Sequence, residues 1–547
     1  MRVSGGDTAR AVTTVDGEHI ERAAEERSTT GRPWFSIALG IVVVIAAVLR
    51  LWSITFGVPM VQYPDEPNIL TPALTMVAQR DLNPHWFVYP GLILYIETLV
   101  VVAVKALSHL VALSTDTIVA LEYVLGRLAM AAFGIATVGL VGAIGHRLAR
   151  RRRALVGLVA AGMLAVSLLL STDAHYLKPD VPTAFFTALT LWFTLDAIEH
   201  GRMRNWLLAA AAVGFAAAFK YTGVAVALVP AIAMLTLPGG WRGWLLRWRT
   251  MLLMAVVAVT VFLAFDPGAI LTPRDFYQQA IVYNDHHYST GHPGSEGSNT
   301  WLWYLEMLWS SGIGPTLAPL VMVGVLDEAW RTARRDRLAP LLLVFPLLYY
   351  LDSSRYLVRF DRQMIPILPF LALIGALWLD RVPVPRLPTV ARGVLVALAV
   401  VAFAVPAVVA AQWDVEIGKT DTRYPALAWV EANLPPGSVV AREWYTPPLA
   451  DHGFQDIYIR SAYEQPVAWF DATHVQYLLV SSFMYQRYLD APQQYPDQAA
   501  FYRKLLAAPA MTRIDPVGTY TGPVIYVFRV VDVRARLNTH AVPPPPG

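Results

Sequence analysis

Two adjacent acids early in the chain have the residue types and the setting for proton-transfer chemistry. Asp65 and Glu66 lie between Pro64 and Pro67, which stiffen the backbone and keep it out of a regular helix. A carboxylate held in this way is suited to act as a general base toward a hydroxyl group. Tyr63, just before these residues, is a candidate contact for an acceptor or a sugar. The alternative is a solvated acidic turn without chemistry.

A second polar segment joins two apolar runs between residues 173 and 182. In it, Lys178 could neutralise an anionic head group, and Asp180 could orient a hydroxyl group or the lysine itself. We include His175 with Asp180 among the candidate contacts to the acceptor or the sugar. The alternative is a short polar turn that leads into a helix at Pro182.

Several cations lie beside apolar runs, which suggests an anion-binding site. Lys220 interrupts a long apolar stretch, where a lysine must reach the membrane surface or meet an anion. Arg355, Arg359 and Arg362 precede another apolar run, and the planar guanidinium group matches the oxygens of a phosphate. The alternative for these arginines is an aromatic and basic belt at the membrane interface.

Three histidines, His286, His287 and His292, lie in one glycine-containing segment. Histidine clusters bind metals, and Asp285 would add a carboxylate ligand. Because adjacent histidines seldom share one metal, we expect His287 and His292 to hydrogen-bond the acceptor or the sugar donor instead. We therefore assign no metal site and no required cofactor, with a divalent metal as the alternative.

Composition indicates what kind of protein must position these residues. The chain has 547 residues, of which 56% are hydrophobic and only 15% are charged, whereas soluble domains carry about 25% charged residues. Long apolar runs are typical of membrane helices, so we predict a polytopic α-helical membrane protein. The small net charge of +3 argues against nucleic acid as a partner, and the lack of cysteine excludes disulfides and thiolate sites.

The basic residues between the apolar runs predict the topology, because such clusters favour the cytoplasmic side. The clusters lie at 147–153, 200–204, 242–249, 331–337 and 381–392. With all of them inside, the eleven predicted spans are 34–56, 119–146, 153–171, 181–198, 204–219, 221–238, 251–266, 313–328, 338–350, 363–380 and 392–411. Residues 90–113 are apolar too, but a span there would reverse this order. We predict a re-entrant or interfacial helix at 90–113, with a span that violates the charge rule as the alternative.

Changes of composition divide the chain into three parts. Residues 1–33 are polar and predict a disordered cytoplasmic tail. Residues 34–411 form the membrane domain that carries the candidate site, and residues 412–547 an extracytoplasmic α/β domain that ends in a disordered proline-rich tail. In this last part we expect a helix at 424–433 and strands at 438–441, 475–481 and 523–530.

The order of these motifs resembles glycosyltransferase family 39 of the GT-C superfamily, which includes the protein mannosyltransferases and the bacterial aminoarabinose transferases. The resemblance covers roughly residues 35–411, and no single motif is specific by itself. It rests on Arg50-Leu51, Asp65-Glu66, Tyr89-Pro90-Gly91-Leu92, Gly126-Arg127-Leu128, the segment from His175 to Pro182, Phe219-Lys220-Tyr221-Thr222-Gly223, and Arg355-Tyr356 before Pro366 and Pro369.

The resemblance implies a GT-C-like fold of about eleven spans and an inverting glycosyltransferase that uses a polyprenyl-phosphate sugar donor. It implies that Asp65 is the base that deprotonates the acceptor hydroxyl, that Glu66 supports it, and that Asp180 is the acid of the second external loop. The candidate ligands of the donor phosphate are Lys178, Lys220, Arg127, Arg355 and Arg359.

The expected partners are the lipid-linked donor, the bilayer and an envelope glycan, lipid or protein as acceptor. The site would lie on the extracytoplasmic side of the cell membrane. Two other functions fit the same features: a transporter or flippase, and a ligase that acts on pyrophosphate-linked oligosaccharides. Transporters often contain internal repeats, which we do not find in this sequence.

Overall fold

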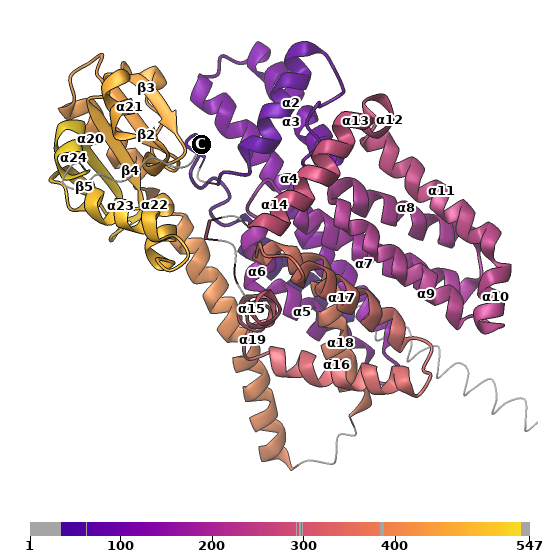
Figure 1. The fold of residues 1–547 in the computed structure, drawn as a ribbon. Helices are drawn as coiled ribbons and strands as arrows, with labels where there is room; N and C mark the ends of the chain where they lie inside the picture. The colour runs from indigo at the N-terminus through magenta and orange to yellow at the C-terminus, as the bar shows by residue number, and fades with distance from the viewer. Residues whose placement is uncertain are drawn as a thin grey trace, which may run out of the picture.

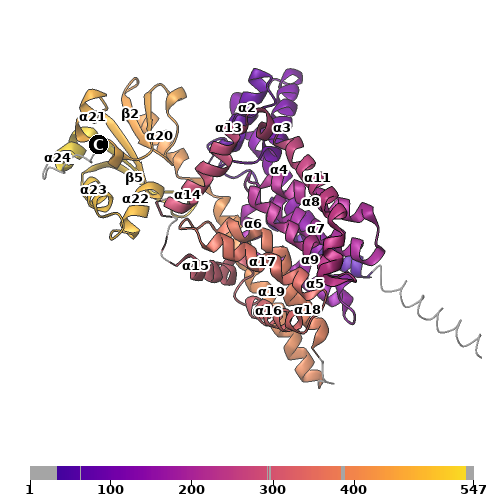
Figure 2. The ribbon, with the colours of Figure 1, turned by 45° about the vertical axis from the view of Figure 1, so that its right-hand side comes forward.

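The structure is a computed structural model that describes residues 34–61, 63–291, 293–294, 297, 299–382 and 388–537. The predicted tail at 1–33, His292 and the proline-rich C-terminus lie outside the described residues. Two parts are visible in Figures 1 and 2. One, which we call the helical body, comprises the described residues up to 417, and the other, the sheet-bearing part, comprises residues 420–537.

Helices make up the body throughout. They are Trp34–Leu51, α2 (Pro67–Gln79), α3 (Gly91–Leu110), α4 (Thr115–Leu148), α5 (Arg153–Ala165), α6 (Leu168–Asp173), α7 (Asp180–His200), α8 (Met203–Phe219), α9 (Leu228–Thr236), α10 (Gly240–Leu246), α11 (Trp248–Phe265), α12 (Gly268–Leu271), α13 (Pro273–Phe276), α14 (Asn284–Thr290), α15 (Thr300–Met307), α16 (Ala318–Ala333), α17 (Ala339–Ser354), α18 (Leu368–Arg381) and α19 (Thr389–Ile417). Every predicted span overlaps one of these helices or two consecutive helical segments, which confirms the polytopic α-helical prediction.

Fewer helices than predicted spans are long and apolar enough to cross a membrane. Among the described residues seven helices are, and an eighth is added if Tyr221–Thr236 and Gly240–Leu246, which meet at a sharp bend, count as one span. The number is lower than eleven because some predicted spans are short or interrupted. The span expected at 153–171, for instance, is divided between α5 and α6.

The predicted segment 90–113 contains the uninterrupted helix α3 (Gly91–Leu110), which is one of these seven. Its length and composition fit the alternative of a true span, and the re-entrant or interfacial position stays a prediction. In Figures 1 and 2, α3 lies with α2 and α13 at one end of the helical body. The first residue of α3 is anchored there, because the Gly91 backbone N–H donates to the Asp266 carboxylate just after α11 at 2.9 Å.

Small residues let the central helices approach closely. Gly145 of α4 faces Gly157 of α5, where a Cβ on Gly145 would lie 3.2 Å from the Gly157 Cα. Close backbone contact at small residues is a common way for helices to associate in a bilayer, where apolar side chains gain little by leaving lipid. The break after α8 depends on a similar contact, because a Cβ on Gly223 would lie 2.3 Å from the Ala216 carbonyl oxygen.

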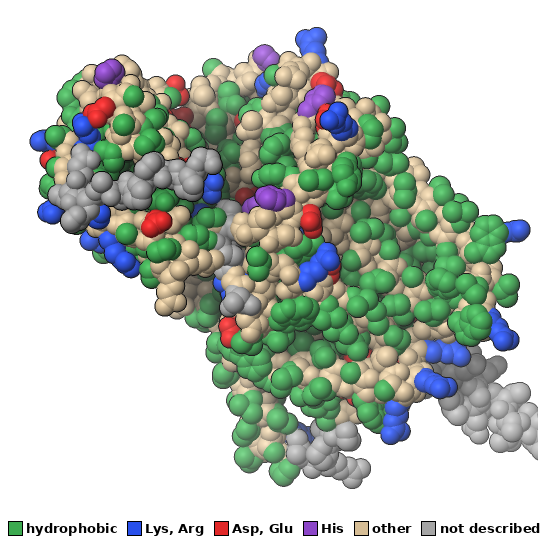
Figure 3. All heavy atoms as spheres, viewed as in Figure 1, with side chains coloured by type: hydrophobic (Ala, Val, Ile, Leu, Met, Phe, Trp, Pro, Cys, Tyr) green, Lys and Arg blue, Asp and Glu red, His purple; other side chains and the backbone are tan. Residues whose placement is uncertain are grey.

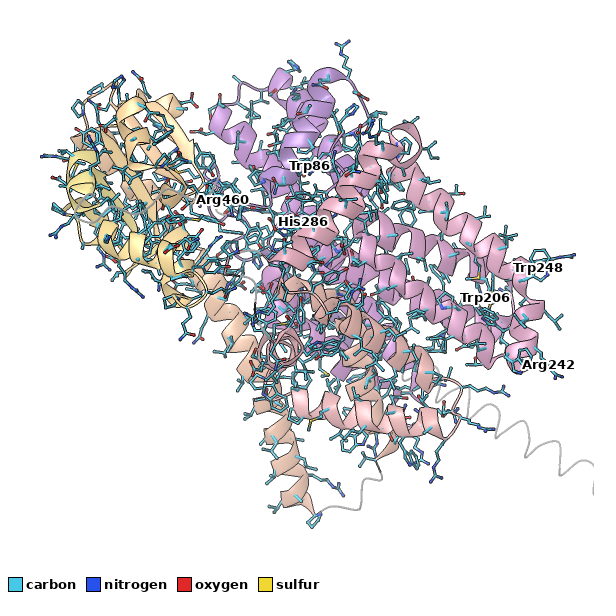
Figure 4. All side chains as sticks on the ribbon, in the orientation of Figure 1. Trp86, Trp206, Arg242, Trp248, His286 and Arg460 are labelled. Carbon is cyan, nitrogen blue, oxygen red and sulfur yellow. The ribbon has the colours of Figure 1, made fainter. Side chains whose placement is uncertain are left out.

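The predicted basic clusters lie at the end of the body opposite to α2 and α3. The backbone N–H groups of Arg150, Arg151 and Arg152 all donate to the Asp380 carboxylate, at 2.6–2.9 Å. Figure 3 shows a broad band of hydrophobic side chains across the body with Lys and Arg below it, and Figure 4 places Arg242 at this lower end. Arg150 to Arg152 and Arg242 therefore lie toward the same end of the body, and the side of the membrane on which that end lies stays a prediction.

The sheet-bearing part follows α19, which continues beyond the predicted end of its span at 411. Its five-stranded sheet has the order β3-β2-β4-β7-β5, with β2 parallel to β3 and β4, and β7 antiparallel to β4 and β5. The strands are β2 (Val439–Glu443), β3 (Gln455–Ile459), β4 (Tyr477–Ser481), β5 (Ala510–Ile514) and β7 (Ile525–Arg529), with a separate pair β1 (Thr420–Asp421) and β6 (Tyr520–Thr521). The helices are α20 (Arg423–Asn433), α21 (Val467–Ala472), α22 (Ser482–Asp490), α23 (Pro496–Leu506) and α24 (Val530–Leu537).

Successive apolar side chains of β4 pack against helices on opposite faces of this sheet. Leu478 packs in one cluster with Tyr502 of α23, whereas Leu479 packs in another with Val430 of α20. Successive side chains of a strand point to opposite faces, so a strand that is buried on both sides reads as a continuous apolar run. The predicted helix at 424–433 and the three predicted strands are confirmed as α20, β2, β4 and β7.

Candidate functional site

Glu66 and Arg127 form a fully buried ion pair beneath the first loop. Arg127 donates from Nε and Nη2 to the two Glu66 carboxylate oxygens at 2.8 and 2.7 Å, and neither side chain is exposed. Nη1 of Arg127 donates to the backbone carbonyls of Ile54 and Phe56. The Leu177 backbone N–H also donates to Glu66 at 3.0 Å. This pair fastens the first loop to α4 and to the second loop.

The prediction that Arg127 binds the donor phosphate is therefore not supported by its surroundings. Its guanidinium group is engaged by Glu66 and two carbonyl oxygens and has no exposed surface. A phosphate could reach it only by displacing a buried carboxylate, which would leave that carboxylate without its partner. Glu66 holds the loop that carries Asp65 through Arg127 and Leu177, and its supporting role toward Asp65 stays a prediction.

Asp65 lies at the surface of the same loop and pairs with Arg362. The Arg362 Nη2 is 3.0 Å from the Asp65 Oδ2, and Asp65 keeps 22% of its side chain exposed. The Arg362 Nη1 donates to the Tyr63 hydroxyl at 2.8 Å. One arginine thus orients both the candidate base and the aromatic residue beside it.

Lys178 forms the second acid–base pair of the site with Asp173. Its Nζ lies 3.1 Å from the Asp173 Oδ1 and 3.6 Å from the centre of the Tyr63 ring. Burial raises the pKa of Asp173 to about 6, and the neighbouring Lys178 ammonium group opposes that rise. The second carboxylate oxygen of Asp173 is buried and has no hydrogen-bond partner. Tyr63 therefore joins this pair to the Asp65–Arg362 pair.

Lys220 and Asp180 form the third pair. Their Nζ and Oδ1 atoms are 2.5 Å apart, and Asp180 is almost completely buried at the start of α7. Lys220 has an extended backbone directly after α8, so the helix break expected at this position is present. The Lys220 side chain crosses from α8 to α7, which the sequence distance between the two residues would not suggest.

Tyr288 of α14 lies near both the Asp180–Lys220 pair and the Asp65–Arg362 pair. Burial raises the pKa of its phenol, the positive charges of Lys220 and Arg362 lower it, and the negative charge of Asp180 raises it. The Tyr288 backbone carbonyl also accepts from the N–H groups of Leu357 and Val358, so α14 is tied to the arginine-rich loop. Three acid–base pairs from four separate segments thus surround one region.

The remaining predicted contacts fall outside this region or at its border. Arg355 is exposed and pairs with Asp352 and with the Tyr356 hydroxyl. Arg359 lies over the Trp303 ring with 5.5 Å between the guanidinium carbon and the ring centre. Arg355 thus pairs with an exposed acid three residues before it, whereas Arg362, the third arginine of the motif, pairs with Asp65.

Of the predicted histidine contacts, His175 belongs to none of the three pairs, and His287 lies at their border. His175 is completely buried, with its ring nitrogens 2.9 and 2.8 Å from the carbonyl oxygens of Ser171 and Trp52, so it is not placed to contact an acceptor. His287 is half-buried and stacks against Phe360. Burial lowers the pKa of the His287 imidazole, and Arg362 and Asp65 act on it in opposite directions, which puts it at the border of the site.

Two residues of the cluster were missed or undervalued by sequence reasoning. Arg362 was noted only as the third arginine of its motif, and Asp173 was interpreted as part of a polar turn. The available signal for Arg362 was its position in the first turn of the helical segment Asp361–Ile367, which fixes the direction of its side chain. For Asp173 the signal was the lysine five residues later.

The described residues contain one group of three side chains that could hold a metal ion, Asp196, Glu199 and His200. It lies at the basic end of the body, and Arg147 already pairs with Asp196 and Glu199 at 2.8 Å each. Within the described part of the chain, the expected alternative of Asp285 with His286 and His287 does not form such a group.

The sheet-bearing part holds the first loop in place. Arg423, at the start of α20, pairs with Asp421 and donates to the carbonyl oxygens of Val61 and Met60, at 2.8 and 3.3 Å. The Tyr424 hydroxyl donates to the Val58 carbonyl at 2.8 Å. These contacts lie a few residues before Asp65, so the C-terminal part contributes to the position of the candidate base.

Comparisons with known proteins concern the fold and part of the helical body. Residues 98–265 match the family model described as dolichyl-phosphate-mannose-protein mannosyltransferase. No curated protein is similar enough in sequence to count as a relative.

Among solved structures, the chain is similar to the archaeal oligosaccharyltransferase AglB from Archaeoglobus fulgidus in complex with an inhibitory peptide and a dolichol-phosphate. The TM-score is 0.57 at 12% identity, over 89% of this chain and 74% of that one. It is also similar to ArnT from Cupriavidus metallidurans in the apo state, with a TM-score of 0.51 at 16% identity, over 91% of this chain and 98% of that one. Likeness at these identities concerns the fold. The chain therefore shares the fold of these two proteins, and the family match covers residues 98–265, which is less than half of its length.

Proposed function

We propose that the protein transfers a sugar, with inversion, from a polyprenyl-phosphate donor to a hydroxyl group of a cell-envelope acceptor on the extracytoplasmic side of the membrane. One observation carries this proposal. The pairs Asp65–Arg362, Asp173–Lys178 and Asp180–Lys220 gather at the end of the helical body opposite to the basic clusters. Acids that can take a proton and cations that can bind a phosphate are therefore available in one place.

The cations are suited to stabilise a leaving phosphate. Lys178 and Lys220 are mostly buried, where the attraction between opposite charges is stronger than in water. As the bond to the sugar breaks, negative charge develops on the phosphate oxygens, and pre-positioned cations lower the free energy of that transition state. Each lysine is already held by a carboxylate, so it needs little reorganisation when the donor arrives.

Asp65 is the candidate general base. In the proposed step, the acceptor oxygen bonds to the anomeric carbon while the bond from that carbon to the phosphate oxygen breaks. The electron pair leaves with the polyprenyl phosphate, and the hydroxyl proton passes to Asp65. Its partial exposure permits contact with an acceptor from water, and Arg362 orients it. Glu66 acts as a positioning residue, because the Arg127 pair occupies both of its oxygens.

The site requires no metal in this proposal, since Lys178, Lys220 and Arg362 supply the positive charge that the phosphate needs. The donor class is supported by the family match and by the fold shared with a protein solved with dolichol-phosphate. The external location is supported by the basic clusters at the opposite end, because such clusters favour the cytoplasmic side.

The test uses the purified full chain in lipid nanodiscs with a panel of polyprenyl-phosphate sugars and envelope extracts. Release of polyprenyl phosphate and appearance of glycosylated product are measured by mass spectrometry. We expect release with at least one monophosphate-linked donor, and we expect Asp65→Asn to abolish it while donor binding persists. Asp352→Asn, which removes an exposed acid paired with Arg355, is the matched control and should retain turnover.

Three results would contradict the proposal. Normal turnover in Asp65→Asn would remove the base from the mechanism. Solute or lipid translocation without release of polyprenyl phosphate from any donor would favour the transporter. Turnover confined to pyrophosphate-linked oligosaccharides would replace the donor class by that of the ligase.

A further inference from the structure

Aromatic and basic side chains collect at one edge of the sheet. Because β3, β2 and β4 are parallel, their carboxyl ends meet at the same edge, which is the usual place for ligands in open α/β sheets. The chain leaves β2 into Trp444 and Tyr445, and leaves β3 into Arg460. It leaves β4 into α22, which carries Phe483 and Arg487. We call these five residues the edge platform.

The edge platform is one continuous set of contacts. Arg460 lies over the Trp444 ring at 5.8 Å, and Trp444 meets Tyr445 edge-on at 6.5 Å between ring centres. Tyr445 meets Phe483 at 5.7 Å. Arg487 lies 5.1 Å from the Tyr445 ring and donates to its hydroxyl at 2.6 Å. One arginine therefore lies at the Trp444 end of a row of three aromatic rings, and the other lies beside the central ring, Tyr445.

Exposure and backbone strain indicate that this row is not simply core. Phe483 is 45% exposed, and the Arg460 side chain is exposed to the same extent. Tyr445 has a φ of 66°, in the left-handed region that a residue with a Cβ seldom occupies. Strained residues of this kind persist where the surrounding structure holds them, and they are common at ligand sites.

A buried glutamate holds the edge rigid beneath the platform. Glu443, the last residue of β2, accepts from the Tyr502 hydroxyl at 2.5 Å and from the Ala462 N–H at 2.7 Å. It also accepts from the Ser481 N–H at the end of β4. Glu443 thus connects the ends of three neighbouring strands, so the rings that follow start from fixed backbone positions.

The edge platform borders the catalytic region. A Cβ on Gly294 would lie 3.2–3.4 Å from the Arg487 side chain, so the loop after α14 touches the platform. The same α14 carries Tyr288, which lies among the charges of the three pairs. Figure 4 places Arg460 on the border of the sheet-bearing part that faces His286 of the helical body, and Figure 3 shows a hollow between the two parts.

We propose that the edge platform binds an anionic oligosaccharide and that this oligosaccharide is the acceptor chain. The proposal rests on the glycosyl-transfer function above and names the class of its acceptor. The faces of aromatic rings carry partial negative charge and attract the polarised C–H groups of a sugar ring. The guanidinium groups of Arg460 and Arg487 match carboxylate or phosphate substituents.

Charge on the platform is available to such a ligand. Arg487 donates to a neutral hydroxyl, so its positive charge is retained. Arg460 is 3.5 Å from Glu464 in an exposed pair, and pairs of this kind contribute little to stability. An anionic substituent can therefore replace Glu464 as the partner of Arg460 at small cost.

The experiment measures binding of oligogalacturonates to the full chain in nanodiscs, with cello-oligosaccharides as neutral probes and an acidic unstructured peptide as the protein-like probe. We expect oligogalacturonates to bind, and expect Trp444→Ala and Arg460→Gln each to weaken that binding about tenfold, as for a central contact in an interface. Arg534→Gln is the matched control, because Arg534 also pairs with an exposed acid, Asp471, but near the start of β4.

Each outcome decides the inference. Equal affinity of Arg460→Gln and Arg534→Gln, preference for the acidic peptide, or no oligogalacturonate binding by the unaltered protein would overturn it. Thermal unfolding of each variant is measured alongside, and Phe483→Ala, which removes an exposed ring, replaces any variant that does not fold. If the unaltered protein turns over a donor but the platform variants lose no oligogalacturonate binding, only the platform is refuted. If the unaltered protein turns over no donor, the proposed function is refuted.

Discussion

Asp65 and Glu66 are neighbours with opposite surroundings, so they should respond in opposite ways to the loss of charge. Replacing Glu66 by Gln keeps the size of the side chain but removes the charge that compensates Arg127. Glu66 accepts hydrogen bonds from Arg127 Nε, Arg127 Nη2 and the Leu177 N–H. After the substitution, the guanidinium group would remain fully buried beside a neutral amide.

The magnitude follows from this burial. Neither partner of the Glu66–Arg127 pair is exposed, and removal of one partner from such a pair costs about 3–5 kcal/mol because an uncompensated charge stays buried. The Asp65–Arg362 pair is partly exposed, so Asp65→Asn should cost about 1 kcal/mol or less. Its effect on turnover should be the larger one, about 10²–10⁴-fold for the loss of a general base.

The assay compares the two substitutions in the same detergent. Thermal unfolding is followed by intrinsic fluorescence, and turnover by release of polyprenyl phosphate. We expect Glu66→Gln to unfold at a clearly lower temperature and Asp65→Asn to unfold close to the unaltered protein but to be inactive. The double variant Glu66→Gln with Arg127→Met should recover part of the lost stability, because it no longer buries a lone charge.

The reasoning is refuted if Glu66→Gln is as stable as Asp65→Asn. It is also refuted if the double variant is less stable than Glu66→Gln by the full cost of removing Arg127, since the two side chains would then act independently. In either case the buried pair would not be what fixes the first loop.

Three further predictions concern the rest of the site. Below its pKa of about 6, Asp173 becomes neutral and no longer compensates the charge of Lys178, so the KM for the donor should fall about tenfold between pH 7 and pH 5. Asp173→Asn should show the low KM at both pH values. If the KM of this variant depends on pH as in the unaltered protein, the assignment to Asp173 is contradicted. Lys220→Met leaves Asp180 buried without its partner and should raise the donor KM, whereas an altered acceptor KM alone would place Lys220 elsewhere. Arg423→Gln should lower kcat with little change in the donor KM, with recovery by Arg423→Lys, because it loosens the first loop; a change confined to KM would argue against that positioning role.

Local properties of the chain were enough to predict most helices and several strands. Hydropathy is set by consecutive residues, so the apolar runs identified the membrane helices, and Lys220 correctly marked the end of α8. The strands β2, β4 and β7 were predicted because they read as apolar runs. The edge strands β3 and β5 were missed, because polar residues such as Gln455 and Asp456 interrupt their apolar pattern.

For the site, the sequence alone determined which residue types were available and roughly where, but not which would meet. Arg355, Arg359 and Arg362 look equivalent in the chain, yet only the tertiary structure decided that Arg362 pairs with Asp65. Arg127 carries the same charge as Arg362 but forms a buried ion pair with Glu66. The physical reason is that an ion pair depends on distance and burial, which residues far apart in sequence acquire only when the helices that carry them pack together.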